Sequence, residues 1–410
     1  MTRWAKLGLL AVAATAVVLL FGFKILPFAA STAPVKGTTA DGNSKPSPEK
    51  ASGERKLGLA EPLLLPGDKT APPPRDRIED AISRGLAFLA RTQNKTTGGW
   101  VQDVGFKFND QYEVMVANQD HVGVSALALM AFLAGGHLPG RGRYGDVVER
   151  GTDYIIRCVD TDTGYISANE TRMYSHAFAT LYLAEVYGMT QRADVHEKLQ
   201  QAVDLTVKTQ NRQGSWRYRP YAPDSDMSIA VCQLMALRAA RNIGIAVPKS
   251  TITRAYDYIE RSNYGPGSSR QFNGAFRYMI DQPQARVSFA LAAAGIAALL
   301  HAGFYEDDMV TRGLRWLKKR VQRPHFSEKF PTYFYWYGNY YAAQVMFIAN
   351  DTHPGLWDDF YWPMMSRNLI RSQSMDGSWR NDPGPGQVFG TAVASLILQI
   401  PYEYLPIFQR

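Results

Sequence analysis

The sequence predicts an all-α protein, an (α/α)6 toroid in which six helix pairs close into a ring. A short unit recurs along the chain: a basic or polar residue, Gly or Ala, two free positions, an aromatic and an aliphatic residue. The intervals between the aromatic positions of its copies are 66, 51, 53, 58 and 52 residues, which is typical of stacked units that cannot bury their apolar faces alone. Helical periodicity continues from about residue 76 to residue 400 with few strand signals. The copies begin at Arg84, Arg150, Gln201, Arg254, Arg312 and Met364.

The amino terminus has the pattern of a membrane signal. Arg3 and Lys6 precede a mostly apolar run, residues 7–26, which contains the single charge of Lys24. A spanning helix needs ~20 apolar residues, and most cleaved signals have a shorter apolar core. Residues 1–30 are therefore predicted to be a signal anchor, with a cleaved signal peptide as the alternative. The basic flank predicts that the rest of the chain lies on the periplasmic or extracytoplasmic side of a bacterial cell membrane.

Residues 31–75 are predicted to be a disordered linker, because they are rich in Pro, Ser, Gly, Lys and Thr and offer little apolar surface to bury. One apolar run, Leu63 to Leu65, could pack on the domain that follows. Residues 1–75 carry ten Lys and Arg against five Asp and Glu, whereas the remaining residues carry 35 against 32. The repeat region is therefore almost neutral, which argues against a nucleic-acid partner.

The repeat region divides into outer and inner helices that alternate along the chain. The inner helices are the more apolar set, and a helix that is apolar on most sides must be buried on most sides. We therefore expect six inner helices inside six outer ones, around a hollow apolar centre. The predicted outer helices are 77–92, 145–159, 192–209, 250–262, 307–322 and 357–372, and the inner helices are 120–135, 173–187, 225–243, 284–302, 335–350 and 387–400.

A Gly-plus-aromatic turn joins the members of most pairs. Gly permits a left-handed backbone there, and the aromatic residue can pack into the seam with the next repeat. Gln93, Gln210 and Gln373 each lie six or seven residues before a Trp. We expect these Gln amides to bond free backbone groups at a neighbouring helix end.

With these residues in view, the chain resembles the prenyltransferase and squalene-cyclase repeat superfamily. RGLAFLARTQNKTTGGW, at residues 84–100, fits the QW pattern of that superfamily, and residues 201–216 and 373–379 fit it in part. The segments at 173–190 and 224–240 resemble a bacterial branch whose chemistry is not established. The resemblance implies that residues 76–410 form one such domain. Known enzymes of the superfamily cyclise isoprenoids by protonation or transfer a prenyl group with zinc.

The resemblance makes Asp226 and Asp224 candidate catalytic residues. Class II cyclases use an Asp-x-Asp-Asp motif, in which the middle Asp is the acid and is kept protonated by its surroundings. The corresponding stretch here reads Asp224-Ser225-Asp226-Met227. Asp226 takes the position of the proton donor, and Met227 replaces the last Asp. The alternative is a structural role, because Asp is a good N-cap at a helix start.

Zinc chemistry and the size of the known cyclases fit this chain less well. Cys158 and Cys232 both lack the Asp two positions earlier that the zinc enzymes use, and Asp120, His121 and His176 lack thiolate partners. We therefore expect no metal and no other cofactor. The well-known cyclases place their cavity between two barrels, whereas this chain has one. Prenyltransferase β subunits hold a ligand within one barrel but need a second subunit, so a protein partner is a further possibility.

Aromatic residues could line a ligand site. Residues 333–341 contain seven aromatics in nine positions, and ring faces can stabilise a cation. The alternative is a packed core, because seven rings cannot all point inward from one helix. The candidate ligand-binding residues are Tyr174, His176, Trp216, Phe276, Tyr335 and Trp336.

Three functions remain open from the sequence. The first is an enzyme that binds and cyclises or transfers an isoprenoid or other apolar ligand near the membrane. The second is a non-catalytic toroid that binds lipid or protein. The third is a carbohydrate-active toroid, which needs two carboxylates ~5–10 Å apart across an open cleft. Its candidate carboxylates are Asp120, Glu170, Asp224 and Asp226.

Overall fold

The computed structural model describes residues 71–108, 111–282, 286–325 and 328–409. The predicted anchor at 1–30, with its membrane helix at 7–26, lies outside the described residues, as does most of the predicted linker at 31–75. In the described part of the chain, no helix is both long enough and apolar enough to cross a bilayer. The domain starts with helix α1 at Arg75.

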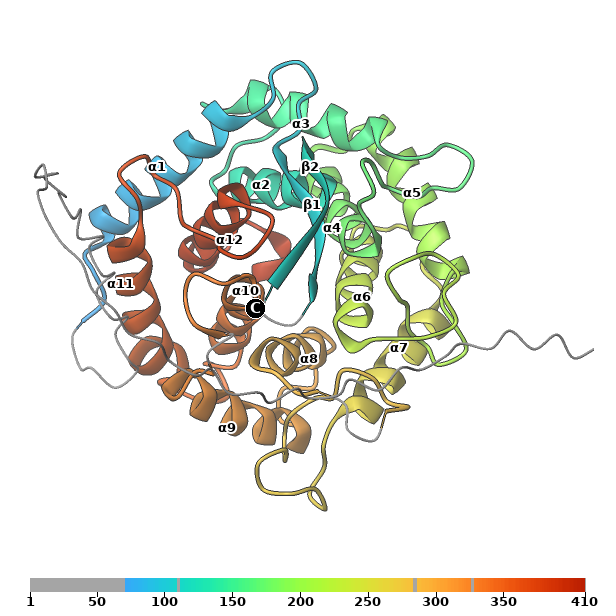
Figure 1. Cartoon of the computed structure of the whole chain (residues 1–410), viewed down its shortest axis with the longest axis vertical. Helices are drawn as coiled ribbons and strands as arrows, with labels where there is room; N and C mark the ends of the chain where they lie inside the picture. Colours follow the sequence, from blue (N-terminus) through green and yellow to red (C-terminus); the bar gives the residue numbers. More distant parts are fainter. Residues whose placement is uncertain (1–70, 109–110, 283–285, 326–327, 410) are drawn as a thin grey trace, which may run out of the picture. The chain divides into compact units, whose positions relative to one another are not determined.

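Six helices form a closed inner ring, which confirms the predicted toroid (Figure 1). Each inner helix contacts the next one around the ring, and α12 contacts α2. All residues of α2 are buried and none is charged, as expected for a helix surrounded by other helices. The inner helices are α2 (Val122–Ala134), α4 (Met173–Thr190), α6 (Met227–Asn242), α8 (Phe289–His301), α10 (Tyr333–Ile348) and α12 (Gln387–Gln399).

The outer helices surround this ring and bury only one face each (Figure 1). In the sixth pair, the predicted helix at 357–372 is a π-helical segment, η2 (Leu356–Tyr361), followed by α11. Two short 3-10 helices, η3 (Ile400–Tyr402) and η4 (Pro406–Phe408), end the described chain. The outer helices are α1 (Arg75–Thr92), α3 (Gly145–Arg157), α5 (Ala193–Lys208), α7 (Lys249–Ser262), α9 (Asp308–Gln322) and α11 (Trp362–Ser372).

A β-hairpin between α1 and α2 departs from the predicted all-α fold. Strands β1 (Val101–Phe108) and β2 (Gln111–Asp120) pair antiparallel. The hairpin extends over the inner helices in Figure 1, and two contacts fix its base to the loop before α12. The backbone N of Asp103 donates to the carbonyl of Pro385 at 3.3 Å, and the backbone N of Val388 donates to Oε1 of Gln102 at 3.2 Å. We call this end of the ring the mouth.

Partly buried Gln side chains join successive outer helices, as the sequence predicts. Nε2 of Gln210 donates to the carbonyl of Thr251, in the first turn of α7, at 2.9 Å. Nε2 of Gln373 donates to the carbonyl of Ala81 in α1, also at 2.9 Å. The second bond joins the last repeat to the first, so the ring closes with the kind of contact that also joins the first repeat to the second, where Gln93 donates to the carbonyl of Val147, and the third to the fourth.

The turn glycines let the backbones of neighbouring repeats touch. Gly214 has φ +88°, and a Cβ there would overlap the carbonyl oxygen of Arg254. Gly377 has φ +86°, and a Cβ there would overlap the carbonyl oxygen of Arg84. Both carbonyls belong to the first residue of a repeat copy. In the first repeat, the residue with positive φ is Gly98, two positions before Trp100.

Candidate functional site at the mouth of the toroid

Asp226 lies at the mouth and is the N-cap of α6. Its Oδ1 accepts hydrogen bonds from the backbone N of Ile229 at 2.8 Å and from Oγ of Ser228 at 2.7 Å. Its side chain has no exposed surface. The capping interaction considered from the sequence is therefore present, and it occupies one of the two carboxyl oxygens.

Arg217 joins the two candidate catalytic carboxylates. Its Nε lies 3.2 Å from Oδ2 of Asp224, and its Nη1 lies 3.6 Å from Oδ2 of Asp226. The side chain of Asp224 is about half exposed, at 48 %, in contrast to the buried Asp226. One guanidinium thus holds a solvated and a buried carboxyl group within about 10 Å of each other, a separation that glycosidases use.

Three half-buried tyrosines connect Asp226 to the mouth. The hydroxyl of Tyr278 donates to Oδ2 of Asp226 at 3.3 Å, and the hydroxyls of Tyr278 and Tyr218 form a hydrogen bond with each other. On the other side, the hydroxyl of Tyr174 donates to Oγ of Ser228 at 2.6 Å. Since Ser228 also donates to Asp226, both carboxyl oxygens are linked to hydroxyl groups near the surface.

Burial raises the pKa of Asp226 above its ordinary value. A backbone amide, a serine, a tyrosine and the Arg217 guanidinium all favour the charged form, but the loss of hydration outweighs them. Burial likewise raises the pKa of Tyr278 and of Tyr218, so both hydroxyls stay protonated at neutral pH. The network is therefore rich in hydroxyl protons and surrounds a carboxyl group whose pKa burial raises.

Aromatic side chains bridge the centre of the inner ring. Because α4 and α10 are three positions apart in a closed ring of six, they face each other across it. The ring centroids of Tyr174 in α4 and Tyr337 in α10 are 6.1 Å apart. Those of Phe178 in α4 and Tyr340 in α10 are also 6.1 Å apart. Rings from opposite helices therefore meet in the centre of the inner ring at these two pairs. The prediction of a hollow centre is wrong there.

Both cysteines are free thiols; Cys232 is buried and Cys158 is partly buried. Sγ of Cys232 lies 3.3 Å from the hydroxyl of Tyr337 and 3.2 Å from that of Tyr341. Burial raises the pKa of Cys232 to about 11, so the thiolate needed for nucleophilic attack is scarce at neutral pH. Cys232 is thus a packing residue between α6 and α10.

His176, a predicted ligand-binding residue, lies within the wall of the toroid. Its Nδ1 accepts a hydrogen bond from the backbone N of Ile166 at 3.1 Å, and its Nε2 lies 2.9 Å from Oγ1 of Thr206. Burial lowers the pKa of His176 to about 4, so the ring is neutral at physiological pH. Both ring nitrogens are occupied by contacts that hold the α3–α4 turn against α5.

Four other predicted ligand-binding residues also lie in the packed wall. The indole nitrogen of Trp216 donates to the carbonyl of Thr206, and that of Trp336 donates to the carbonyl of Arg380, both at 2.8 Å. Phe276 is fully buried, and the hydroxyl of Tyr335 points to Sδ of Met365 in α11 at 3.6 Å. Of the six predicted residues, the structure brings Tyr174 to Asp226 through Ser228.

The other two candidate carboxylates lie away from this network. Asp120 ends β2 and accepts a 3.4 Å hydrogen bond from Asn94. Glu170 is exposed in the turn before α4.

The sequence reasoning missed Arg217, Tyr218 and Tyr278, which complete the network around Asp226. The sequence contains a pattern that indicates these three residues. In the third repeat, Arg217-Tyr218 directly follows the turn aromatic, and in the fourth repeat Arg277-Tyr278 does the same. Equivalent positions in consecutive repeats lie next to each other in a toroid, so two Arg-Tyr pairs at one offset predict neighbouring side chains.

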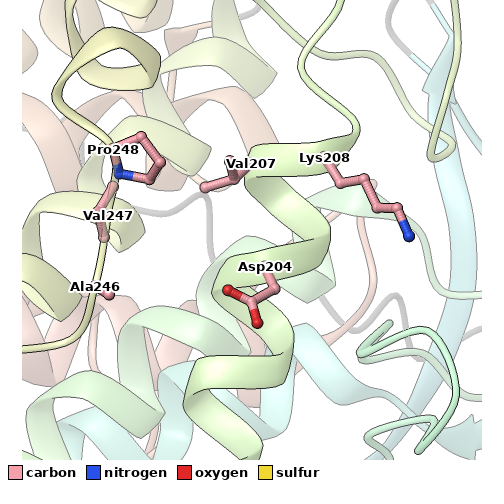
Figure 2. Close-up of a pocket in the computed structure, with 6 residues that line it drawn as sticks. All are labelled: Asp204, Val207, Lys208, Ala246, Val247 and Pro248. Atoms are coloured by element: carbon pink, nitrogen blue, oxygen red, sulfur yellow. The ribbon is translucent and has the colours of Figure 1, made fainter.

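The structure also has a hollow on its outer surface, of about 670 Å³. Figure 2 shows it between α5 and the segment before α7, with Val207 and Pro248 facing each other. None of the candidate site residues lines it. Among the described residues, His, Cys, Asp and Glu side chains do not gather in groups of three or more that could hold a metal. The lining residues are Asp204, Val207, Lys208, Ala246, Val247 and Pro248.

Comparison with known proteins shows relatives in fold alone. No family model and no curated protein matches the sequence. The chain is similar in structure to an α-1,6-mannanase from a Salegentibacter species, with a TM-score of 0.59, 11 % identity, and coverage of 78 % of this chain and 98 % of that one. It is also similar to the type II terpene cyclase MstE from Scytonema, with a TM-score of 0.52, 15 % identity, and coverage of 80 % and 100 %. An α-amylase from Clostridium perfringens matches with a TM-score of 0.53, 10 % identity, and coverage of 78 % and 97 %.

These similarities support a helical toroid that is shared by terpene cyclases and carbohydrate-active enzymes. Because the match covers the whole MstE chain, the single barrel does not separate this protein from type II terpene cyclases. The size argument drawn from the sequence is therefore corrected. The site itself must distinguish the possible functions.

Proposed function

We propose that the toroid binds an apolar ligand of the isoprenoid type at its mouth, between the hairpin and the start of α4. The rings gathered there carry the proposal. Tyr174 and Tyr218 are half-buried, with centroids 6.2 Å apart. The hairpin adds Phe106 and Met115, which are 37 % and 38 % exposed. Arg172, the N-cap of α4, holds both through contacts of 5.5 Å from its guanidinium to the Phe106 ring and 3.0 Å to Sδ of Met115.

The surroundings of these rings suit a chain-like apolar molecule with a small polar end. Ring faces bury apolar carbon and attract positive charge. The hydroxyls of Tyr174, Tyr218 and Tyr278 and the guanidinium of Arg217 would receive the polar end. The predicted anchor at residues 7–26 would hold the mouth on the periplasmic side of a membrane that dissolves such ligands. A protein partner at the mouth would be compatible with this arrangement.

A second candidate function is acid catalysis on the bound ligand by Asp226. It is favoured by the raised pKa of Asp226 and by the hydrogen-bonded path from its Oδ2 through Tyr278 to Tyr218. In the described conformation Asp226 has no exposed surface. A ligand would therefore take its proton through Tyr278, or after the Tyr278 side chain moves aside.

A third candidate is hydrolysis of a carbohydrate. It is favoured by the half-exposed Asp224 and the buried Asp226 on one guanidinium, since enzymes of this class use two carboxylates in different environments. Arg217 occupies the space between them in the described conformation. This candidate therefore requires Arg217 to be displaced by the substrate.

The test is a titration of the purified full-length protein with geranylgeraniol and, separately, with an α-1,6-mannotetraose. We expect saturable binding of the isoprenol and a loss of about fivefold or more in affinity for Tyr218→Ala, since one aromatic contact contributes about 1 kcal/mol. Tyr404→Ala, which removes an exposed ring at the carboxyl end, is the matched control. Absence of isoprenol binding, or equal effects of the two substitutions, would overturn the proposal.

The same incubations separate the two catalytic candidates. A cyclised or rearranged isoprenoid made by the wild type and lost in Asp226→Asn would establish acid catalysis. Release of shorter oligosaccharides, lost in both Asp224→Asn and Asp226→Asn, would establish hydrolysis. Unchanged binding and no product in any variant would leave a binding toroid in which Asp226 supports the mouth as a helix cap.

A further inference from the structure

A second groove, on the outside of the ring, lies between α9 and η2 and has a volume of about 610 Å³. Its floor is apolar, and it includes Leu314 and Phe360, which are largely buried. Its rim carries the exposed cations Arg315 and Lys318, for which no ion pair is found among the described residues. Lys318 stands over the ring of Phe360 with Nζ 4.8 Å from its centroid. The groove thus offers apolar surface beside two cations, Arg315 and Lys318, and one carboxylate, Asp359, so the charge of its rim is net positive.

The described chain begins close to this groove. The carbonyl of Ala71 accepts a hydrogen bond of 2.7 Å from Nη1 of Arg367 in α11. Arg367 follows Phe360 by seven residues along η2 and α11, which is about two helical turns or about 10 Å. Leu65 precedes Ala71 by six residues, and six extended residues span up to about 20 Å. The chain before Ala71 is therefore long enough to reach the groove.

The segment that precedes Ala71 complements the groove in both of its properties. Residues 61–68 read Glu-Pro-Leu-Leu-Leu-Pro-Gly-Asp, so an apolar run is bounded by one acid on each side. Leu63 to Leu65 is the apolar run that stands out in the otherwise polar linker. The flanking Pro62 and Pro66 restrict the free chain, which lowers the entropy lost when such a segment is ordered.

We propose that residues 61–68 bind in the groove between α9 and η2. Leu63 to Leu65 cover its apolar floor, and Glu61 and Asp68 lie toward the cations of Lys318 and Arg315. With this contact, the linker separates from the domain at the groove between α9 and η2 rather than at Ala71. This contact does not depend on the ligand bound at the mouth.

The test is amide hydrogen exchange of the purified full-length protein, read by mass spectrometry on the peptide that covers residues 61–68. We expect this peptide to exchange at least tenfold more slowly than the linker peptide at residues 36–56. Leu64→Asp, which places a charge on the floor, and Lys318→Glu, which reverses the charge on the rim, should each remove this protection.

Two matched controls keep the experiment specific. Leu59→Asp changes an apolar residue of the same linker outside the proposed segment, and Lys319→Glu reverses an exposed charge of α9 that does not line the groove. Both should leave the protection unchanged. The proposal is overturned if the 61–68 peptide of the wild type exchanges at the rate of the linker peptide, or if Lys318→Glu and Lys319→Glu act alike. Protection that grows with protein concentration would instead place the segment in the groove of a second copy.

Discussion

Replacing Glu185 by Gln removes an ionisable group from the interior of α4. Glu185 is 3 % exposed, and its Oε2 has no hydrogen-bond partner. Burial raises its pKa from the ordinary 4.5 to about 8, and the backbone amide of Ile407 opposes this rise only weakly. The side chain is therefore largely neutral in the folded protein at pH 7 and charged in the unfolded chain.

The sign of the effect follows from proton binding. Between pH 4.5 and about 8, the folded protein binds more protons than the unfolded chain, so its stability falls as the pH rises through this window. Each pH unit costs about 1.4 kcal/mol, so the full window costs up to about 5 kcal/mol. Glu185→Gln should abolish this dependence. At pH 9 the free energy of unfolding of Glu185→Gln should exceed that of the wild type by several kcal/mol. At pH 5 the two values should be close to each other.

Urea unfolding at pH 5 and pH 9, followed by tryptophan fluorescence, measures this difference directly. Glu197→Gln in α5 is the control, because its side chain is 67 % exposed and its removal should have the same small effect at both pH values. The reasoning fails if the difference in free energy of unfolding between wild type and Glu185→Gln is the same at pH 5 and pH 9. Such a result would mean that water reaches the carboxylate.

Three further predictions concern the seams and the wall. Gly377→Ala should lower the free energy of unfolding by about 3 kcal/mol or more, because the added methyl group overlaps a carbonyl of the first repeat. Gly303→Ala should lower it by only about 1 kcal/mol, because Gly303 has φ +90° but nothing within 4 Å. Thermal unfolding compares the two variants. Gln210→Leu should cost about 1–3 kcal/mol in urea unfolding, because the buried carbonyl of Thr251 loses its donor, and an unchanged midpoint would show that this bond is dispensable. The pKa of His176, lowered to about 4, predicts that stability is lost as the pH falls from 6.5 towards 4, by up to about 3 kcal/mol; His176→Asn should flatten that part of the pH profile, and an unaltered profile would exclude His176 as its cause.

The helices could be predicted because their signals are local. The start of α4 at Met173 and that of α12 at Gln387 agree with the sequence prediction to the residue, since an apolar run follows a polar, turn-forming stretch in both places. The hairpin escaped prediction for the opposite reason. In β2, the strand-forming residues Tyr112, Val114 and Val116 lie two positions apart, but Met115 interrupts the alternation with polar residues, and this short pattern lies inside a connection expected to be a turn. Its contacts with Pro385, Val388 and Arg172 join residues far apart in the sequence, and a local pattern does not reveal them.

The site could be predicted only where chemistry and local sequence coincide. Asp226 stands at a recognisable helix start, so its position at the mouth follows from the sequence. The contact of Tyr174 with Tyr337 joins residues 163 positions apart across the ring, and no periodicity tells which face of α10 meets α4. Trp336 and Tyr337 are neighbours in sequence, yet one packs in the wall and the other in the centre. Composition alone could therefore suggest a ring-lined interior but not which rings fill it.

The bond from Gln373 to Ala81 gives the boundary between the last repeat and the first the same contact as the boundaries between the first and second and between the third and fourth repeats. The two ends of the described chain also meet, since the guanidinium of Arg75 lies over the ring of Tyr402 at 5.4 Å. The order of the repeats along the chain is thus one of several orders that could form the same toroid. A gene that fuses these ends through a short spacer and opens the polypeptide in the exposed loop between α7 and α8, at Gly267, should encode a circular permutant with the same architecture.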